Sequence, residues 1–302
     1  MSIPVPNIEE GIEYWADQPA SLDGVLGGYG TGSLPRIDAL GSRQFLLSLR
    51  PDLCTVPSSL RSQDKIDSDK TRPRTRGLDV GAGIGRVTKD VLLPLLDDVV
   101  LLEPVKSLVD QAVAAGRASA SSETSEKGQK WKGIEEKTKS VVILQGTLQA
   151  FDPSNIITVS PSSQSDTDTK SVKLLDRVGY APTTDSPTSD LVERFDVIWC
   201  QWCLGHLSDV DIVPFFRQCK AALRDTKDAL IVVKENLCSD PADGGARTVF
   251  DEQDSSLTRS DMAWKEAFTA AGLQLIDERV QEGLPEGLYV VKACVLSINL
   301  PL

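Results

Sequence analysis

The sequence predicts an α/β fold: a doubly wound, mostly parallel sheet of seven strands with an N-terminal helical lid. The glycine-rich run Gly77–Arg86 begins as a buried strand, turns sharply and continues as an amphipathic helix. A second apolar run, Val99–Leu102, ends at Glu103. Further apolar runs alternate with helical patterns, which is typical of a parallel sheet that helices cover on both faces.

Composition limits the protein class. The 302 residues suffice for one α/β domain with insertions, and we expect a single domain over residues 1–302. No apolar run reaches the roughly 18 residues of a membrane span, and no secretory signal is expected. The net charge of −12 argues against a nucleic-acid partner, because binding phosphates requires a basic surface. Six scattered cysteines suit reduced thiols in an intracellular protein.

The elements follow in order along the chain. Residues 7–19 predict a helix that Pro19 ends, Leu22–Gly30 a glycine-rich loop and residues 34–49 a second helix, which together form the lid over residues 7–50. Strands are expected at 77–80, 99–102, 141–145, 195–200, 229–234 and 289–296, the last one antiparallel. Further helices are expected at 85–96, 105–117, 209–223 and 261–271. Polar segments at 51–76, 117–140 and 153–192 predict mobile loop insertions, because they hold too little apolar surface to offset the entropy of ordering.

The glycine spacing points to a nucleoside ligand. Asp79-x-Gly81-x-Gly83-x-Gly85 differs from the dinucleotide fingerprint and is the pattern of S-adenosylmethionine-dependent methyltransferases with a doubly wound sheet. Glycines let a ligand approach the backbone closely beside a helix N-terminus. Glu103, at the tip of the second strand, is placed to bind two ribose hydroxyls. The alternative is a tight strand-to-helix turn without a ligand.

Cys200 and Cys203 form a Cys-x-x-Cys pair at the end of a predicted strand. A redox or metal site is disfavoured, because the pair does not open a helix and no second pair completes a zinc site.

Several motifs together resemble the protein N-terminal α-amine methyltransferases, a class I, Rossmann-like family dependent on S-adenosylmethionine. The resemblance covers residues 10–296 apart from the polar segments, and its motifs are Tyr14-Trp15, Leu26–Gly30, Leu78–Arg86, Asp196–Leu207 and Asp254–Ser256. It implies methylation of protein N-termini that read Xaa-Pro-Lys or Xaa-Pro-Arg, with ribosomal proteins as candidate substrates. It also implies a monomer in the cytoplasm or the nucleus, with no nucleic-acid or membrane partner.

The same resemblance assigns site residues. Those expected to bind the cofactor are Gly81, Gly83, Arg86, Glu103, Leu148, Gln149 and Gln201. Those expected to bind the peptide are Tyr14, Trp15, Leu26, Gly27, Trp202, Asn236 (after the fifth strand), Asp251, Ser256 and Tyr289. Relatives more often carry Asp at position 103 and at position 235, so the contact of Glu235 stays open.

Asp254 and His206, the single histidine of the chain, are the expected catalytic residues. An α-amino group with a pKa of about 7.7–8.0 is largely protonated near neutral pH, so an enzyme that methylates it must remove a proton. Two alternatives remain: a methyltransferase of a small molecule or RNA, and a cofactor-binding module that has lost methyl transfer.

Overall fold

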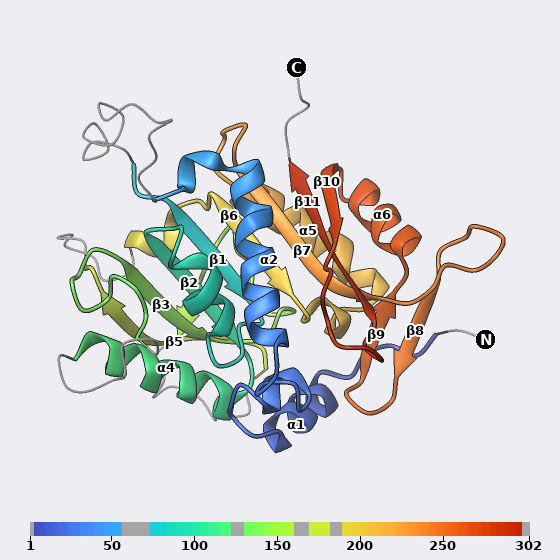
Figure 1. Ribbon diagram of the computed structural model, residues 1–302, viewed down its shortest axis with the longest axis horizontal. Helices are drawn as coiled ribbons and strands as arrows, with labels where there is room; N and C mark the ends of the chain where they lie inside the picture. Colours follow the sequence, from blue (N-terminus) through green and yellow to red (C-terminus); the bar gives the residue numbers. More distant parts are fainter. Residues whose placement is uncertain (1–2, 56–72, 122–129, 160–168, 182–188, 298–302) are drawn as a thin grey trace.

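The computed structural model describes residues 3–55, 73–121, 130–159, 169–181 and 189–297 of the chain. Within them the main sheet has nine strands in the order β10-β11-β7-β6-β1-β2-β3-β5-β4 (Figure 1). Its strands are β1 Arg76–Val80, β2 Asp98–Glu103, β3 Ser140–Gln145, β4 Thr158–Val159, β5 Val172–Gly179, β6 Val197–Gln201, β7 Leu230–Leu237, β10 Gln274–Val280 and β11 Val290–Ser297. The hairpin β8 Thr248–Asp251 and β9 Ser256–Arg259 forms a separate sheet.

The predicted α/β class is confirmed. Strands β3, β2, β1, β6 and β7 run parallel, and β11 pairs antiparallel with β7, as expected for the last strand. The sheet is wider than the seven strands predicted, because β4 and β10 extend its two edges.

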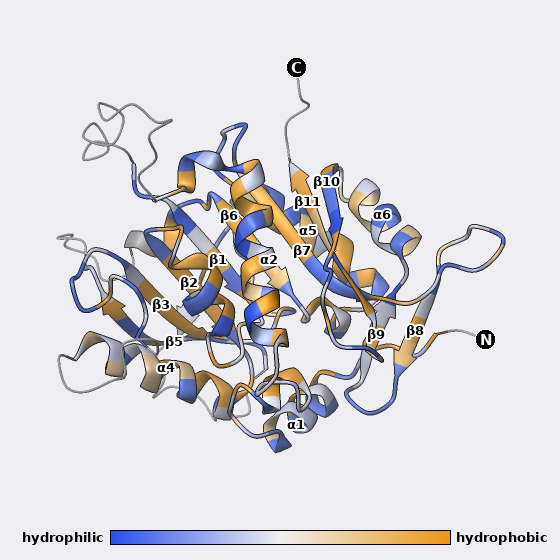
Figure 2. Cartoon of the chain, viewed as in Figure 1, coloured by the Kyte–Doolittle hydropathy of each residue, from blue (hydrophilic) through white to orange (hydrophobic). Residues whose placement is uncertain are grey.

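Helices cover both faces of this sheet. The helices are α1 Ile8–Asp17, α2 Leu34–Leu49, α4 Lys106–Ala120, α5 Asp209–Ala222 and α6 Asp261–Ala270, with short helical turns η1 Gly24–Leu26, η2 Pro51–Leu53, η4 Thr88–Leu92, η6 Ser189–Val192 and η7 Leu204–His206. One buried cluster joins the sheet to α5 and α6, and a second joins its other face to α2, η4 and α4. Because both faces are covered, the central strands contain long apolar runs, as the orange first half of β7 shows in Figure 2.

Local chemistry explains where the helices begin. Asn7 caps α1 by accepting hydrogen bonds from two backbone amides of its first turn. Ser208 and Ser260 cap α5 and α6 in the same manner. The helix expected at 85–96 is shorter than predicted and contains the π-helical turn η4. No helix among the described residues is long and apolar enough to cross a membrane.

Parts of the predicted loop insertions are ordered structure. The segment 153–192 contains β4 and β5, and β5 pairs antiparallel with β3. The segment 117–140 contains the end of α4 and the buried Trp131 and Ile134, which belong to the core. A half-buried strand near the edge of the sheet and two isolated apolar residues barely change the average composition, so the sequence did not predict them. Residues 56–72, 122–129, 160–168 and 182–188 lie outside the described residues.

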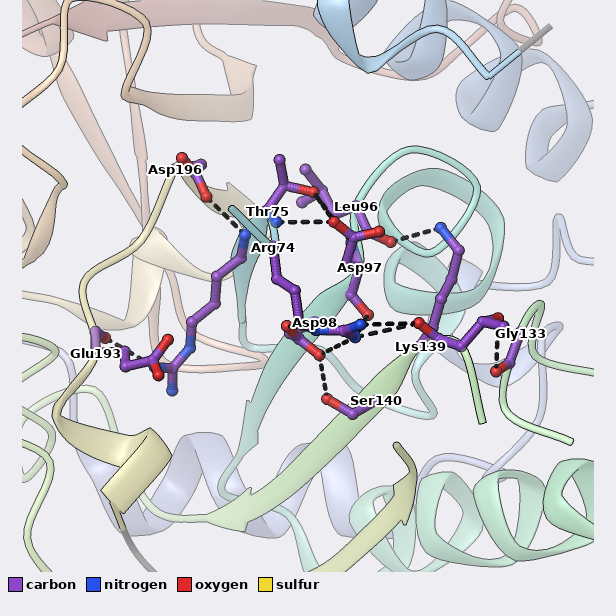
Figure 3. Close-up of polar contacts among 12 residues, drawn as sticks. Arg74, Thr75, Leu96, Asp97, Asp98, Gly133, Lys139, Ser140, Glu193 and Asp196 are labelled. Carbon is purple, nitrogen blue, oxygen red and sulfur yellow. Dashed lines mark hydrogen bonds and ion pairs between the residues drawn. The ribbon is translucent and has the colours of Figure 1, made fainter. Parts of the chain in front are cut away.

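Charged side chains bind one another at the end of the sheet where β1, β2 and β3 begin (Figure 3). The guanidinium of Arg74 donates to both carboxylate oxygens of Asp98, at 2.7 and 2.6 Å. Ser140 Oγ donates to the same carboxylate, and Lys139 Nζ donates to the backbone carbonyl of Leu96. These bonds align the amino ends of three strands. The carboxyl ends of the same strands lie on the opposite side of the sheet, where open α/β sheets bind ligands.

Candidate active site

A cavity of about 350 Å³ opens at the carboxyl ends of β1, β2, β6 and β7, and α1 and η1 border it. It brings together residues that lie far apart in the sequence, from Ile8 to Val291. The predicted site residues that line it are Trp15, Leu26, Gly27, Gly81, Gly83, Arg86, Glu103, Leu148, Gln149, Gln201, Trp202, His206, Asn236, Asp254, Ser256 and Tyr289. Their individual roles remain predictions.

Two predicted residues, Tyr14 and Asp251, do not line the cavity. Tyr14 packs edge-on against Trp15, with ring centres 5.3 Å apart. Burial raises the pKa of Tyr14, and the nearby Asp254 and Asp251 raise it further. Asp251 is exposed at the end of β8. Both therefore lie beside the site rather than in its wall.

The glycine loop forms part of the cavity wall. Gly81 and Gly83 have φ values of +63° and +57°. A Cβ at Gly81 would lie 2.3 Å from Cβ of Cys203, so a side chain does not fit there. The buried Asp79 accepts hydrogen bonds from the backbone N and the Oγ1 of Thr88, at 2.8 and 2.6 Å, which fixes the start of the following helix.

Glu103 lies beside this loop. Its carboxylate accepts from the backbone N of Gly83 at 2.7 Å and from the backbone N of Val105 at 2.9 Å. Burial raises the pKa of Glu103 to about 7 despite these two hydrogen bonds. Glu103 thus lies at the carboxyl end of β2 and in the cavity wall, and ribose binding there stays a prediction.

A buried network of charges lies around Arg86 in the cavity wall, and the sequence did not predict two of its members, Asp38 and Lys234. The carboxylate of Asp38 accepts from Arg86 Nη1, from Lys234 Nζ at 2.6 Å and from Gln201 Nε2 at 2.9 Å. Lys234 Nζ also donates to Ser42 Oγ at 2.9 Å. The signal available in the sequence was a lysine inside the apolar run of β7.

This network leaves a cation in excess. The side chains of Arg86, Lys234 and Asp38 are 8%, 1% and 0% exposed, so one carboxylate serves two buried cations. Burial opposes ionisation of Asp38, yet Arg86 and Lys234 hold its pKa below the ordinary value. A further anion beside Arg86 is therefore favourable, and the carboxylate of an amino-acid ligand fits that requirement.

Trp202 lies in a strained turn after β6. Its φ is +55°, which is unusual for a bulky residue and common at functional sites. Its buried Nε1 has no hydrogen-bond partner among the described residues, and its ring lies under the Arg86 guanidinium, with Cζ 5.3 Å from the ring centre. Glu235 holds the turn, because its carboxylate accepts from the backbone N of Cys203 and of Leu204, both at 3.0 Å. The contact of Glu235, which the sequence left open, is therefore with the backbone of this turn.

Helix α1 is fastened over the two predicted catalytic residues. Trp15 Nε1 donates to His206 Nε2 at 3.1 Å, and the backbone N of Asn7 donates to Ser255 Oγ at 2.9 Å. Burial lowers the pKa of His206, although Asp254 opposes the shift. Asp254 Oδ1 is buried and makes no hydrogen bond within the part of the chain that the structure describes.

The remaining predicted residues complete the wall. Leu148 is buried, and Gln149 Nε2 donates to the backbone carbonyl of His206 at 2.8 Å. Asn236 lies within β7 rather than after it, because β11 continues the pairing and Val291 stands opposite. Tyr289 is 51% exposed at the mouth.

Comparison with known proteins gives consistent matches. The family model described as "AdoMet dependent proline di-methyltransferase" matches residues 6–154 and 167–297. The chain is 32% identical to alpha N-terminal protein methyltransferase 1 of Arabidopsis thaliana, over 97% of this chain and 80% of that protein. It is 31% identical to N-terminal Xaa-Pro-Lys N-methyltransferase 1 of Danio rerio, over 95% and 93%. A solved SAM-dependent methyltransferase of Leishmania major is 28% identical, with a TM-score of 0.57 over 96% of this chain and 82% of that one.

Proposed function

This chain belongs to the family of AdoMet-dependent proline di-methyltransferases, and we propose that it methylates the α-amine of proteins whose N-terminus reads Xaa-Pro-Lys or Xaa-Pro-Arg. It is an S-adenosylmethionine-dependent methyltransferase. The observation that carries the proposal is a set of three buried groups in one cavity that make no hydrogen bond within the described residues: Oδ1 of Asp254, which is an acceptor, and the indole N–H groups of Trp202 and Trp264, which are donors.

The residues on the β1–β2 side fit the cofactor. S-adenosylmethionine supplies a methyl group on a sulfonium, which is the electrophile of the reaction. Arg86 takes an amino-acid carboxylate, because the charge network already holds an excess cation there. Glu103 takes the ribose hydroxyls, and Leu148 and Gln149 border the adenine. Gly81 lets the ligand meet the backbone of the loop.

Asp254 is the proton acceptor that we propose. The amine of a protein N-terminus has a pKa of about 7.7–8.0 and becomes nucleophilic only after it loses its proton. Oδ1 of Asp254 is buried in the cavity and no described residue donates a hydrogen bond to it, so an ammonium group is a suitable partner. His206 lies close by, but Trp15 already occupies its Nε2.

The substrate end of the cavity suits a chain terminus. The flat face of Trp202 fits the proline ring at the second position, and Asn236 can bond the backbone of the first residues. Helix α1 narrows the opening, which excludes an internal lysine. The exposed Asp251, at the end of β8, and Glu252, which follows it, are placed to pair with a basic third residue of the peptide. The acidic balance of the chain favours such a basic peptide over RNA.

Three finer expectations are part of this proposal. Ribosomal proteins are candidate substrates, the enzyme acts as a monomer, and it works in the cytoplasm or the nucleus. Each can be checked with the purified protein or with a tagged copy in cells.

Mass spectrometry of synthetic peptides tests the function. We expect methyl groups on the N-terminus of Xaa-Pro-Lys peptides, none after N-terminal acetylation, and a much slower reaction when the third residue is Glu. Methylation that survives acetylation contradicts the α-amine assignment, and equal rates for Lys and Glu favour a different substrate class. Cofactor binding without methylation of any of these peptides favours the inactive module.

Asp254→Asn tests the proton acceptor. The change keeps the shape of the side chain but removes its basicity, so we expect kcat to fall by roughly 10²-fold or more. Asp225→Asn, at an exposed position outside the cavity wall, serves as the matched control and should retain wild-type turnover. Near-normal turnover of Asp254→Asn removes this residue from the proton-transfer step.

A further inference from the structure

We infer that His206 is a positioning residue that latches helix α1 over the site through Trp15, and that it takes no proton from the substrate. The inference rests on the proposed function, because it divides the work between the two predicted catalytic residues. It starts from one hydrogen bond, Trp15 Nε1 to His206 Nε2, at 3.1 Å. An indole N–H can only donate, so Nε2 must be the unprotonated, accepting nitrogen of a neutral imidazole.

The other ring nitrogen is engaged as well. The backbone of Ser255 interacts with the imidazole and raises its pKa, which is the effect of a carbonyl oxygen beside a ring N–H. Gly11 of α1 lies against the same nitrogen, since a Cβ at this position would be 3.1 Å from Nδ1. With Nε2 bonded to Trp15 and Nδ1 covered by Gly11, the ring offers no free lone pair to an incoming ammonium group.

The surroundings keep the ring neutral. His206 is buried, and burial lowers its pKa. The charged group that acts on it is Asp254, on the β8–β9 turn, and the hydroxyl of Tyr14 on α1 also faces the acidic pair Asp254 and Asp251. The carboxylate raises the pKa of the imidazole, but the loss of water outweighs it.

The latch closes the roof of the cavity. Ile8, Ile12 and Trp15 of α1 line the cavity, and the backbone N of Asn7 binds Ser255 of the β8–β9 turn. Trp15 and His206 are 191 positions apart in sequence, so their bond holds the N-terminal lid to the loop after β6. A closed lid excludes water and fixes the direction from which the amine reaches Asp254.

Nitrogen NMR of the histidine ring tests the latch without any substrate. His206 is the single histidine, so ¹⁵N labelling gives one unambiguous imidazole. We expect the neutral tautomer with its proton on Nδ1 at pH 7 to pH 8, and a shift of the Nε2 resonance in Trp15→Phe. A charged ring at pH 7, or a proton on Nε2, overturns the inference whatever the substrate is.

Kinetics with an Xaa-Pro-Lys peptide test the functional consequence. We expect Trp15→Phe and His206→Ala each to lower kcat/KM about tenfold, the size of one lost hydrogen bond, and the double variant to be no worse than either. His206→Gln offers an amide oxygen to Trp15 and should restore most of the activity, with an unchanged pH profile. Thermal melts confirm that each variant is folded.

The opposite pattern contradicts the latch. If His206→Gln is as inactive as His206→Ala while Trp15→Phe keeps full activity, the imidazole acts on the proton. If no peptide is methylated by the unaltered enzyme, the proposed function fails, and the NMR result still decides the state of His206.

Discussion

Asp38→Asn removes the carboxylate that two buried cations share. Asp38 is fully buried, and its partners Arg86 and Lys234 are 8% and 1% exposed, so water cannot replace it. Breaking a buried ion pair by removing one partner costs about 3–5 kcal/mol, because the other charge stays buried and unpaired. At about 2–4 °C for each kcal/mol in a chain of this size, Tm should fall by about 6–20 °C.

Urea unfolding and calorimetric titration with S-adenosylmethionine measure the two consequences. Stability should fall as above, and cofactor affinity should weaken at least tenfold, since Arg86 and Gln201 lose the group that positions them. Asp110→Asn is the control: its pair with Lys106 is more than half exposed, so the change should stay within about 0.5 kcal/mol.

A second change separates charge from packing. In Asp38→Asn, Lys234 is the more deeply buried of the two unpaired cations, so adding Lys234→Met should recover part of the lost stability. The buried-charge reasoning is wrong if Lys234→Met lowers the stability of Asp38→Asn as much as it lowers that of the unaltered protein. It is also wrong if Asp38→Asn is as stable as the Asp110→Asn control.

Gly81→Ala should cost at least about 2 kcal/mol in unfolding free energy, because it combines a φ of +63° with a Cβ 2.3 Å from Cys203. Gly83→Ala meets only Val25, at 3.7 Å, and should cost about 1 kcal/mol from its φ alone; equal losses in urea titrations would refute the clash at Gly81. Glu103 has a native pKa of about 7 against 4.5 in the unfolded chain, so the native state binds the extra proton between these values and stability falls as pH rises through that window. Glu103→Gln should show a smaller fall, by up to about 1.4 kcal/mol for each unit of pKa difference, in urea titrations at pH 5 and pH 8; equal slopes would contradict the raised pKa.

Local patterns in the sequence were sufficient to predict the architecture. The apolar run of β2, the glycine loop before Arg86 and the capping residues of the helices depend on neighbours a few positions away. The loop segments were predicted less well. Strand β5 buries few side chains and becomes a strand because β3 offers it an unpaired edge, which no local pattern records.

The site also combines features that local sequence determines with features that depend on distant residues. The sequence by itself determined the class of the fold and the glycine loop with Glu103 at its side, and its resemblance to a family identified most of the predicted residues that meet in one cavity. Only the tertiary structure decided that Asp38 joins Arg86 to Lys234 and that Trp15 occupies the ring of His206. The physical reason is distance along the chain: Asp38 and Lys234 are 196 positions apart, so a charge becomes buried and a lone pair becomes occupied only when packing brings its partner to it.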